Sequence, residues 1–144
     1  GNFTSRIIGA NSSGVYYLIA FDTGSAQIGA ITSNGTTTTY GTSSDYRLKE
    51  NVQPMTGALA KISALKPVTY KWKVDGSDGQ GFIAHELQEL FPEFVTGQKD
   101  DLDASGNVNA QGVDYAKFTA VLTKAIQELS AKVEKLEQQL GATS

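Results

Sequence analysis

The apolar residues near the C-terminus constrain the fold more than any other feature of the chain. Beyond Asp114 they recur at alternating spacings of four and three, at Leu122, Ile126, Leu129, Val133, Leu136 and Leu140. A heptad pattern sustained for about three repeats predicts one long helix that joins other chains in a left-handed coiled coil. The alternative is an amphipathic helix packed on its own domain, which normally carries a wider apolar stripe.

The order of this coiled coil is left open by its core residues. Isoleucine, valine and leucine occupy the a positions and leucine the d positions, which is compatible with two strands and with three. Lys132 at g and Glu137 at the next e can pair between parallel helices. The pattern therefore predicts an oligomer without giving its size.

The first 43 residues have a different character. They are rich in glycine, serine and threonine, and their two charged side chains are Arg6 and Asp22. Apolar runs between turn-forming residues predict short strands at 6–10, 15–21, 27–31 and, after the hairpin signal Asn34-Gly35, at 36–40. Such strands bury too little apolar surface alone, so we expect partner chains to complete this region. A loose tail is the alternative.

Residues 45–113 mix helical and strand patterns, so the expected fold class is α+β. We expect a helix at 55–65 with Pro54 in its first turn, a strand at 68–74, a second strand at 81–84, a helix ended by Pro92, and a polar loop or hairpin tip at 99–109. In the first strand, alternation places Val68, Tyr70, Trp72 and Val74 on one face.

Composition excludes several classes of partner. A net charge of -3 and a pI near 5.1 argue against a nucleic acid, which needs clustered lysine and arginine. Without cysteine there are no disulfides or thiolate metal sites. No apolar run approaches the roughly 20 residues of a membrane span, so we expect no membrane partner. Because Gly1 is not methionine, we expect a fragment of a longer protein or a processed product.

Three other features are weak candidates for a site. His85 lies near Glu86 and Glu89 but has no second histidine at ligand spacing, so we expect no metal and no cofactor. The acidic stretch 100–107 lacks the closing glutamate of a calcium loop. Trp72, with Tyr70, is better explained as core or interface than as a platform for sugars.

Ser44 and Lys49 stand five positions apart where the composition changes. A lysine that has lost its proton can take one from a serine hydroxyl, which can then attack a nearby carbonyl. An ordinary lysine, with a pKa of about 10.4, needs burial or a neighbouring cation to do this at neutral pH. If the segment is a strand, Arg47 and Asp45 lie on the side of Lys49, the first lowering and the second raising its pKa. On spacing alone, a solvated charged turn is the better explanation, because a serine and a lysine five positions apart are common by chance.

Four stretches in order along the chain carry a family resemblance. They are SSDYRLKENV at 43–52, LKPVTYKW at 65–72, GFIAHELQELFP at 81–92 and GVDY at 112–115, and the heptads follow. This succession closely resembles the peptidase S74 family, the C-terminal intramolecular chaperone domain of phage tail spikes, tail fibres and endosialidases. The resemblance covers residues 43 to about 140.

The resemblance implies a homotrimer that folds a fibre and then cuts itself off. The family's catalytic serine falls on Ser44, its catalytic lysine on Lys49, and the scissile bond on Ser43–Ser44. Asp45 and Arg47 match residues around this pair and have a possible supporting role. No role is carried over to His85.

The implied organisation has three parts. Residues 1–43 become the end of a β-rich trimeric stem, 44–113 a small mixed α/β chaperone and autoprotease domain, and 114–144 a helix in a trimeric coiled coil. The partners are two further copies and the fibre stem of the same polypeptide. The location is a virion tail-fibre precursor assembled in the host cytoplasm, with the released domain absent from the mature virion. The alternatives are a non-cleaving trimeric cap and a receptor-binding tip at Trp72 or the acidic loop.

Overall fold

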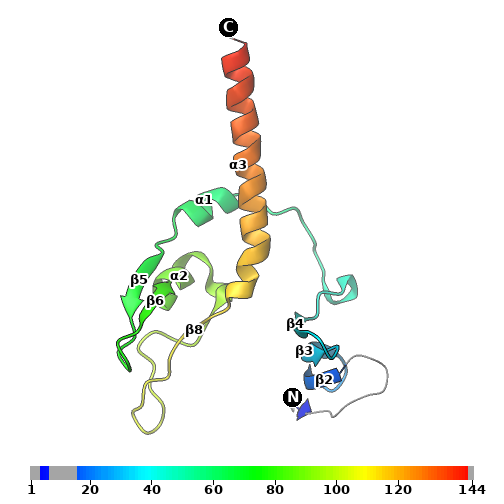
Figure 1. Cartoon of the computed structure of the whole chain (residues 1–144), viewed down its shortest axis with the longest axis vertical. Helices are drawn as coiled ribbons and strands as arrows, with labels where there is room; N and C mark the ends of the chain where they lie inside the picture. Colours follow the sequence, from blue (N-terminus) through cyan, green and yellow to red (C-terminus); the bar gives the residue numbers. More distant parts are fainter. Residues whose placement is uncertain (1–3, 7–15, 143–144) are drawn as a thin grey trace. The chain divides into compact units, whose positions relative to one another are not determined.

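The computed structural model describes residues 4–6 and 16–142, in two compact units, Gly1–Gln53 and Pro54–Ser144 (Figure 1). The units contain several small sheets and one long C-terminal helix, which confirms the α+β class. The boundary expected between residues 43 and 44 is the predicted site of cleavage and not a boundary between compact units. It remains a prediction. Within the described ranges, no helix is long and apolar enough to cross a membrane.

The first unit is an antiparallel meander of four strands in the order β1-β2-β3-β4. Its strands are β1 (Thr4–Arg6), β2 (Tyr16–Asp22), β3 (Gln27–Ser33) and β4 (Thr38–Thr42). The strands expected near 15–21, 27–31 and 36–40 are therefore confirmed. Most of the strand expected at 6–10, and the turn after it, lie outside the described residues.

The β3–β4 hairpin closes around Asn34, as its turn chemistry predicts. The Asn34 side-chain oxygen accepts hydrogen bonds from the backbone N–H groups of Thr36 at 2.9 Å and Thr37 at 2.8 Å. Gly35 has a φ of +85°, a left-handed conformation that favours glycine. The two central residues of the turn are Gly35 and Thr36, one position later than the pair Asn34-Gly35 that the sequence predicts.

This sheet leaves most of its larger apolar side chains exposed. Ala20 is buried, but Phe21 is 46% exposed and Tyr40 is 80% exposed. Leu18 and Ile28 are also exposed. Among the sheet residues whose burial is described, from Leu18 onward, there is therefore little apolar core, in keeping with short strands and small residues.

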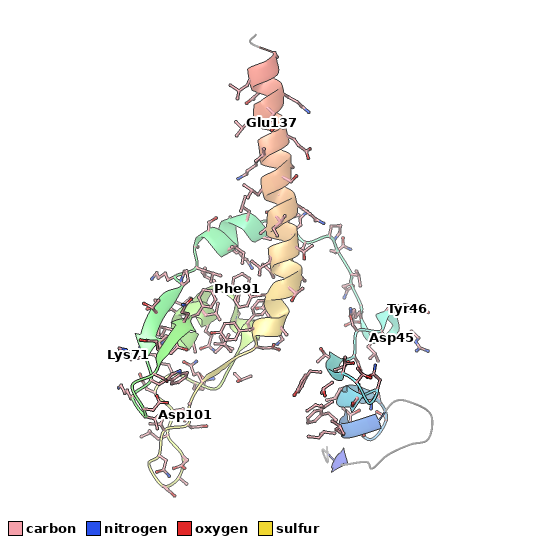
Figure 2. The ribbon with its side chains drawn as sticks, viewed as in Figure 1. Asp45, Tyr46, Lys71, Phe91, Asp101 and Glu137 are labelled. Atoms are coloured by element: carbon pink, nitrogen blue, oxygen red, sulfur yellow. The ribbon has the colours of Figure 1, made fainter. Side chains whose placement is uncertain are left out.

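The second unit has its core in an aromatic cluster. Phe91 is 1% exposed and Phe94 and Phe118 are nearly as buried; the rings of Phe94 and Phe118 meet edge to face at 4.9 Å. Figure 2 shows Phe91 in this cluster beside α3. Leu87 completes its centre, and full burial of such side chains stabilises the fold by on the order of 2–3 kcal/mol each.

Three helical segments supply this cluster. They are α2 (Ala84–Leu90), the 3-10 turn η2 (Pro92–Phe94) and α3 (Phe118–Gly141). As expected, α2 ends just before Pro92, which cannot continue a helix. A further 3-10 turn, η3 (Tyr115–Lys117), precedes α3, so the α-helix begins four residues after Asp114, whose side chain accepts a hydrogen bond from the Ala116 N–H.

Helix α1 (Ala58–Ser63) is shorter than the helix expected at 55–65. Gly57, the residue before it, has a φ of +71°, which is incompatible with a helix running through it, so the placement of Pro54 in a first turn was wrong. Because glycine has no side chain with which to cap the helix, Glu128 of α3 does so. Its carboxylate accepts a hydrogen bond from the Leu59 N–H at 2.9 Å, and this contact lowers the pKa of Glu128.

The two strands of the middle hairpin differ from their expected bounds. β5 (Val68–Lys71) pairs with β6 (Asp78–Gly81), so the strands expected at 68–74 and 81–84 were wrong in extent. A tight turn ends β5, because the Trp72 carbonyl accepts from the Gly76 N–H at 2.7 Å. Val68 and Tyr70 are half-buried as alternation predicts, but Trp72 lies in the turn and is exposed.

The expected polar hairpin tip is confirmed. β7 (Val95–Thr96) pairs with β8 (Gly112–Val113), and the chain between them returns on itself. The Asp103 carboxylate accepts hydrogen bonds from the backbone N–H groups of Ser105 and Asn107 and from the Asn107 side chain, which lowers the pKa of Asp103. Asp103 therefore organises the tip.

Helix α3 carries two separate apolar faces. Phe118, Val121 and Ala125 face the aromatic core. The heptad residues lie on another face and are all exposed, from 44% at Leu122 to 71% at Leu140. Figure 2 shows the side chains around Glu137 standing out from this end of the helix. The heptad seam is thus not the face that packs on the chain's own core, contrary to the single-chain alternative.

Phe91→Ala is expected to lower the free energy of unfolding by about 3–5 kcal/mol, because it leaves a cavity in the centre of the aromatic cluster. Val74→Ala is the matched control, since Val74 is 89% exposed and should change stability by less than about 0.5 kcal/mol. Urea unfolding followed by circular dichroism, at one protein concentration, compares them. Equal losses in the two variants would contradict the placement of the core.

Candidate functional site

Ser43 extends the edge of the sheet by one residue beyond β4. Its N–H donates to the Ile28 carbonyl at 3.0 Å, and its hydroxyl donates to the Gln27 carbonyl at 2.6 Å. Both acceptors belong to the backbone at the start of β3. The residue before the expected cut is therefore attached to β3 at two points.

The chain then turns sharply in the 3-10 turn η1 (Tyr46–Leu48). The Leu48 N–H donates to the Asp45 carbonyl and the Lys49 N–H to the Tyr46 carbonyl, each at 3.1 Å. In an extended strand, residues five apart would be separated by roughly 16 Å. The expectation of a strand here was wrong, and the turn is what returns Lys49 toward Ser44.

Ser44 and Lys49 meet across this turn. The Lys49 amine donates a hydrogen bond to the Ser44 hydroxyl oxygen at 2.6 Å. Both residues are exposed in the single chain. The structure thus brings together the two residues that the sequence singles out, and chemically the contact is a path along which a proton could move between hydroxyl and amine.

Asp45 holds the turn together. Its carboxylate accepts from the Arg47 backbone N–H and Nε at 2.9 Å each, and from Nη2 at 2.7 Å (Figure 2 labels Asp45). This two-pronged pairing lowers the pKa of Asp45 and raises the pKa of Arg47. The guanidinium of Arg47 is therefore directed at Asp45, and the expectation that the two share a strand face with Lys49 was wrong.

A shallow groove of about 500 Å³ lies beside the turn. It is lined by Ala26, Gln27 and Ser43 on the side of the sheet, and by residues of the following segment, including Ser44 and Arg47. Tyr46 and Leu48 at its margin are 80% and 60% exposed. Water reaches the site freely in a single chain.

The other candidate residues lie elsewhere in the chain. His85, on α2, lines a separate hollow with residues of the 97–111 hairpin, including Lys99 and Asp101. Over residues 4–6 and 16–142, no three His, Cys, Asp or Glu side chains gather to hold a metal. Trp72 is 53% exposed and packs edge to face on Tyr70, so it is not a core residue, and its role at an interface remains a prediction.

Sequence reasoning missed one contact of the site, the anchor of Ser43 on β3. The Ser43 hydroxyl and the Gln27 carbonyl are sixteen positions apart, and their contact depends on the β3–β4 register. The hairpin signal at Asn34-Gly35 predicts that these strands pair. It does not say which residues face each other at the open end.

Comparison with protein families assigns the segment that begins at this turn. Residues 44–96 match the model described as chaperone of endosialidase, peptidase S74. This segment belongs to the peptidase S74 family. The S74 segment starts at Ser44, directly after the residue that ends the sheet, and runs through β7.

Three curated relatives of this chain are long tail fiber proteins Gp37. Those of Enterobacteria phages K3 and T2 are each 35% identical over 103 residues, 67% of this chain, and that of phage M1 is 34% identical over 104 residues. The matched part makes up 8%, 7% and 39% of these relatives. The chain therefore spans only a small part of the first two relatives.

The Asp45–Arg47 pair is expected to titrate below the range of an ordinary aspartate. Its contribution to the turn is complete above the unfolded pKa of about 3.9, and it is lost as the pH falls through the lowered pKa of Asp45. An NMR titration from pH 7 to pH 2 that follows the Arg47 Nε–H resonance measures this, and Asp45→Asn should abolish the transition. A midpoint at or above pH 3.9 would contradict the pairing.

Proposed function

We propose that this chain is the C-terminal assembly domain of a phage tail fibre, an intramolecular chaperone that joins three copies and then releases itself by cutting Ser43–Ser44. The S74 match and the tail-fibre relatives support an assembly role. The observation that carries the cutting step is the 2.6 Å contact between the Lys49 amine and the Ser44 hydroxyl, next to the bond.

The proposed reaction uses only groups at the turn. A neutral Lys49 takes the proton of the Ser44 hydroxyl, and Ser44 Oγ attacks the carbonyl carbon of Ser43. A carbon–oxygen bond forms, the peptide carbon–nitrogen bond breaks, and the proton passes from Lys49 to the freed Ser44 nitrogen. Water then hydrolyses the ester and leaves a carboxylate on Ser43 and an amine on Ser44. Because nucleophile and substrate share one chain, the effective molarity can reach about 10⁵ M or more.

This reaction needs surroundings that a single chain lacks. Ser44 and Lys49 are both exposed to water in a single chain. Covering the groove by neighbouring copies would remove water and disfavour the charged form. We therefore propose that cutting depends on assembly, so that the stem is released only after the three chains have joined.

The exposed heptad seam of α3 supports assembly into an oligomer. Its six aliphatic side chains are 44% to 71% exposed, and each would contribute about 1.5–3 kcal/mol when buried against partner helices. The sheet of the first unit adds exposed apolar residues of its own. In the proposal this sheet is the end of the fibre stem, completed by the other two copies, in a virion tail-fibre precursor assembled in the host cytoplasm.

A permanent trimeric cap is the second candidate function. The exposure of Ser44 and Lys49 favours it, because a pair that stays in contact with water would remain inert. The two functions differ in one observable, which is whether the assembled wild-type chain yields a new N-terminus at Ser44.

Cutting is tested by denaturing mass spectrometry of the assembled chain. The wild type is expected to yield fragments 1–43 and 44–144, and Ser44→Ala to remain whole. Lys49→Arg keeps a positive hydrogen-bond donor that does not give up its proton, so it should slow cutting by about 10²–10⁴-fold. Lys73→Arg, at an exposed lysine in the β5–β6 turn, is the matched control and should cut normally. Cutting of Lys49→Arg at the wild-type rate would contradict the proposed mechanism.

Assembly through the seam is tested separately. Leu129→Asp places a charge in the apolar contact of every helix and is expected to abolish the trimer in sedimentation equilibrium. Gln127→Asp adds the same side chain on an exposed position outside the seam and should leave the trimer intact. A trimer that survives Leu129→Asp would show that another surface joins the chains.

A further inference from the structure

The two serines at the proposed cut are held by different partners. The Ser44 hydroxyl oxygen accepts from the Lys49 amine at 2.6 Å. The Ser43 hydroxyl instead donates a hydrogen bond, at 2.6 Å, to the carbonyl of Gln27 on the neighbouring strand β3. Two adjacent residues with the same side chain are therefore in different chemical situations.

The contact of Ser43 bears on the bond itself. Ser43 supplies the carbonyl that Ser44 would attack, so whatever holds Ser43 orients the acyl side of the reaction. Its N–H donates to the Ile28 carbonyl at 3.0 Å and its hydroxyl reaches the next carbonyl along, that of Gln27. The acyl side is thereby held on β3, while the amine side belongs to the turn stabilised by Asp45 and Arg47.

We propose that the Ser43 hydroxyl is a positioning group for cutting, and that it makes the reaction depend on β3–β4 pairing in the stem sheet. This inference rests on the proposed function. Small misplacements of a reacting carbonyl can cost large factors in rate, so one oriented hydrogen bond next to the bond is enough to be measured. Where β3 and β4 are not in register, Gln27 does not face Ser43 and the carbonyl loses its orientation.

The anchor also treats the two serines differently. The Ser43 hydroxyl donates its only hydrogen to the Gln27 carbonyl, which is too weak a base to remove the proton, so this contact holds Ser43 without activating it as a nucleophile. After the cut Ser43 would be the last residue of the stem. Its bonds to β3 involve only stem residues, so they would survive the reaction and hold the new carboxyl end on the sheet.

A pair of variants with nearly the same shape tests the role of the hydroxyl. Ser43→Thr keeps it, and Ser43→Val replaces it by a methyl group with the same β-branching. In trimers matched by sedimentation and circular dichroism, we expect Ser43→Thr to cut within about twofold of wild type and Ser43→Val at least about fivefold more slowly. Thr42→Val, a hydroxyl lost at the preceding position of the same strand, should cut at the wild-type rate.

A second measurement reports on the anchor without cutting. In the uncut Ser44→Ala background, the backbone amide of residue 43 should exchange with solvent at least about fivefold faster in Ser43→Val than in Ser43→Thr. Equal amide exchange rates in the two variants would show that the Ser43 hydroxyl does not hold residue 43 on β3. Equal cutting rates for the Thr and Val variants would overturn its role in the reaction, while a trimeric wild type that stays whole would overturn the proposed function and this inference with it.

Discussion

The packing of Phe91, Phe94 and Phe118 determines which face of α3 the second unit buries and which it leaves exposed. The cluster engages the face of the helix that carries Phe118, Val121 and Ala125. Leu122 and Ile126 of the heptad seam each follow a core residue, Val121 and Ala125, by one position, which is about 100° around the helix. The same helix can therefore anchor the small domain and still expose its whole seam, which explains how a chain with a modest core carries so much exposed apolar surface.

The first unit shows how a few local contacts arrange a reactive pair. Asp45 contacts Arg47 through both carboxylate oxygens, and the resulting turn returns Lys49 to Ser44. On the other side of the bond, the sheet holds Ser43. The candidate site thus depends on a charged pair within the turn and on the pairing of β3 with β4, and each acts on one side of the same peptide bond.

Features that depend on local periodicity or turn chemistry could be predicted from the sequence. The heptad helix, the hairpin at Asn34 and the polar tip near Asp103 are of this kind. Features that depend on distant partners could not: the cap of α1 comes from Glu128, 69 positions after Leu59. The turn at 46–48 was missed for another reason. It is stabilised by the pairing of Arg47 with Asp45, and the sequence pattern alone, which was interpreted as a strand, does not reveal that pairing.

The rigid connection between α3 and its domain has a consequence for errors of assembly. Helices joined through a heptad seam can slip only by whole repeats, and one repeat displaces a helix by about 10 Å along its axis. Because Glu128 and the aromatic cluster fasten the domain to the helix, such a slip would raise one copy of the domain by the same distance. In misaligned assemblies the copies of the domain would therefore be displaced by whole multiples of about 10 Å, a distance too large for side chains to bridge.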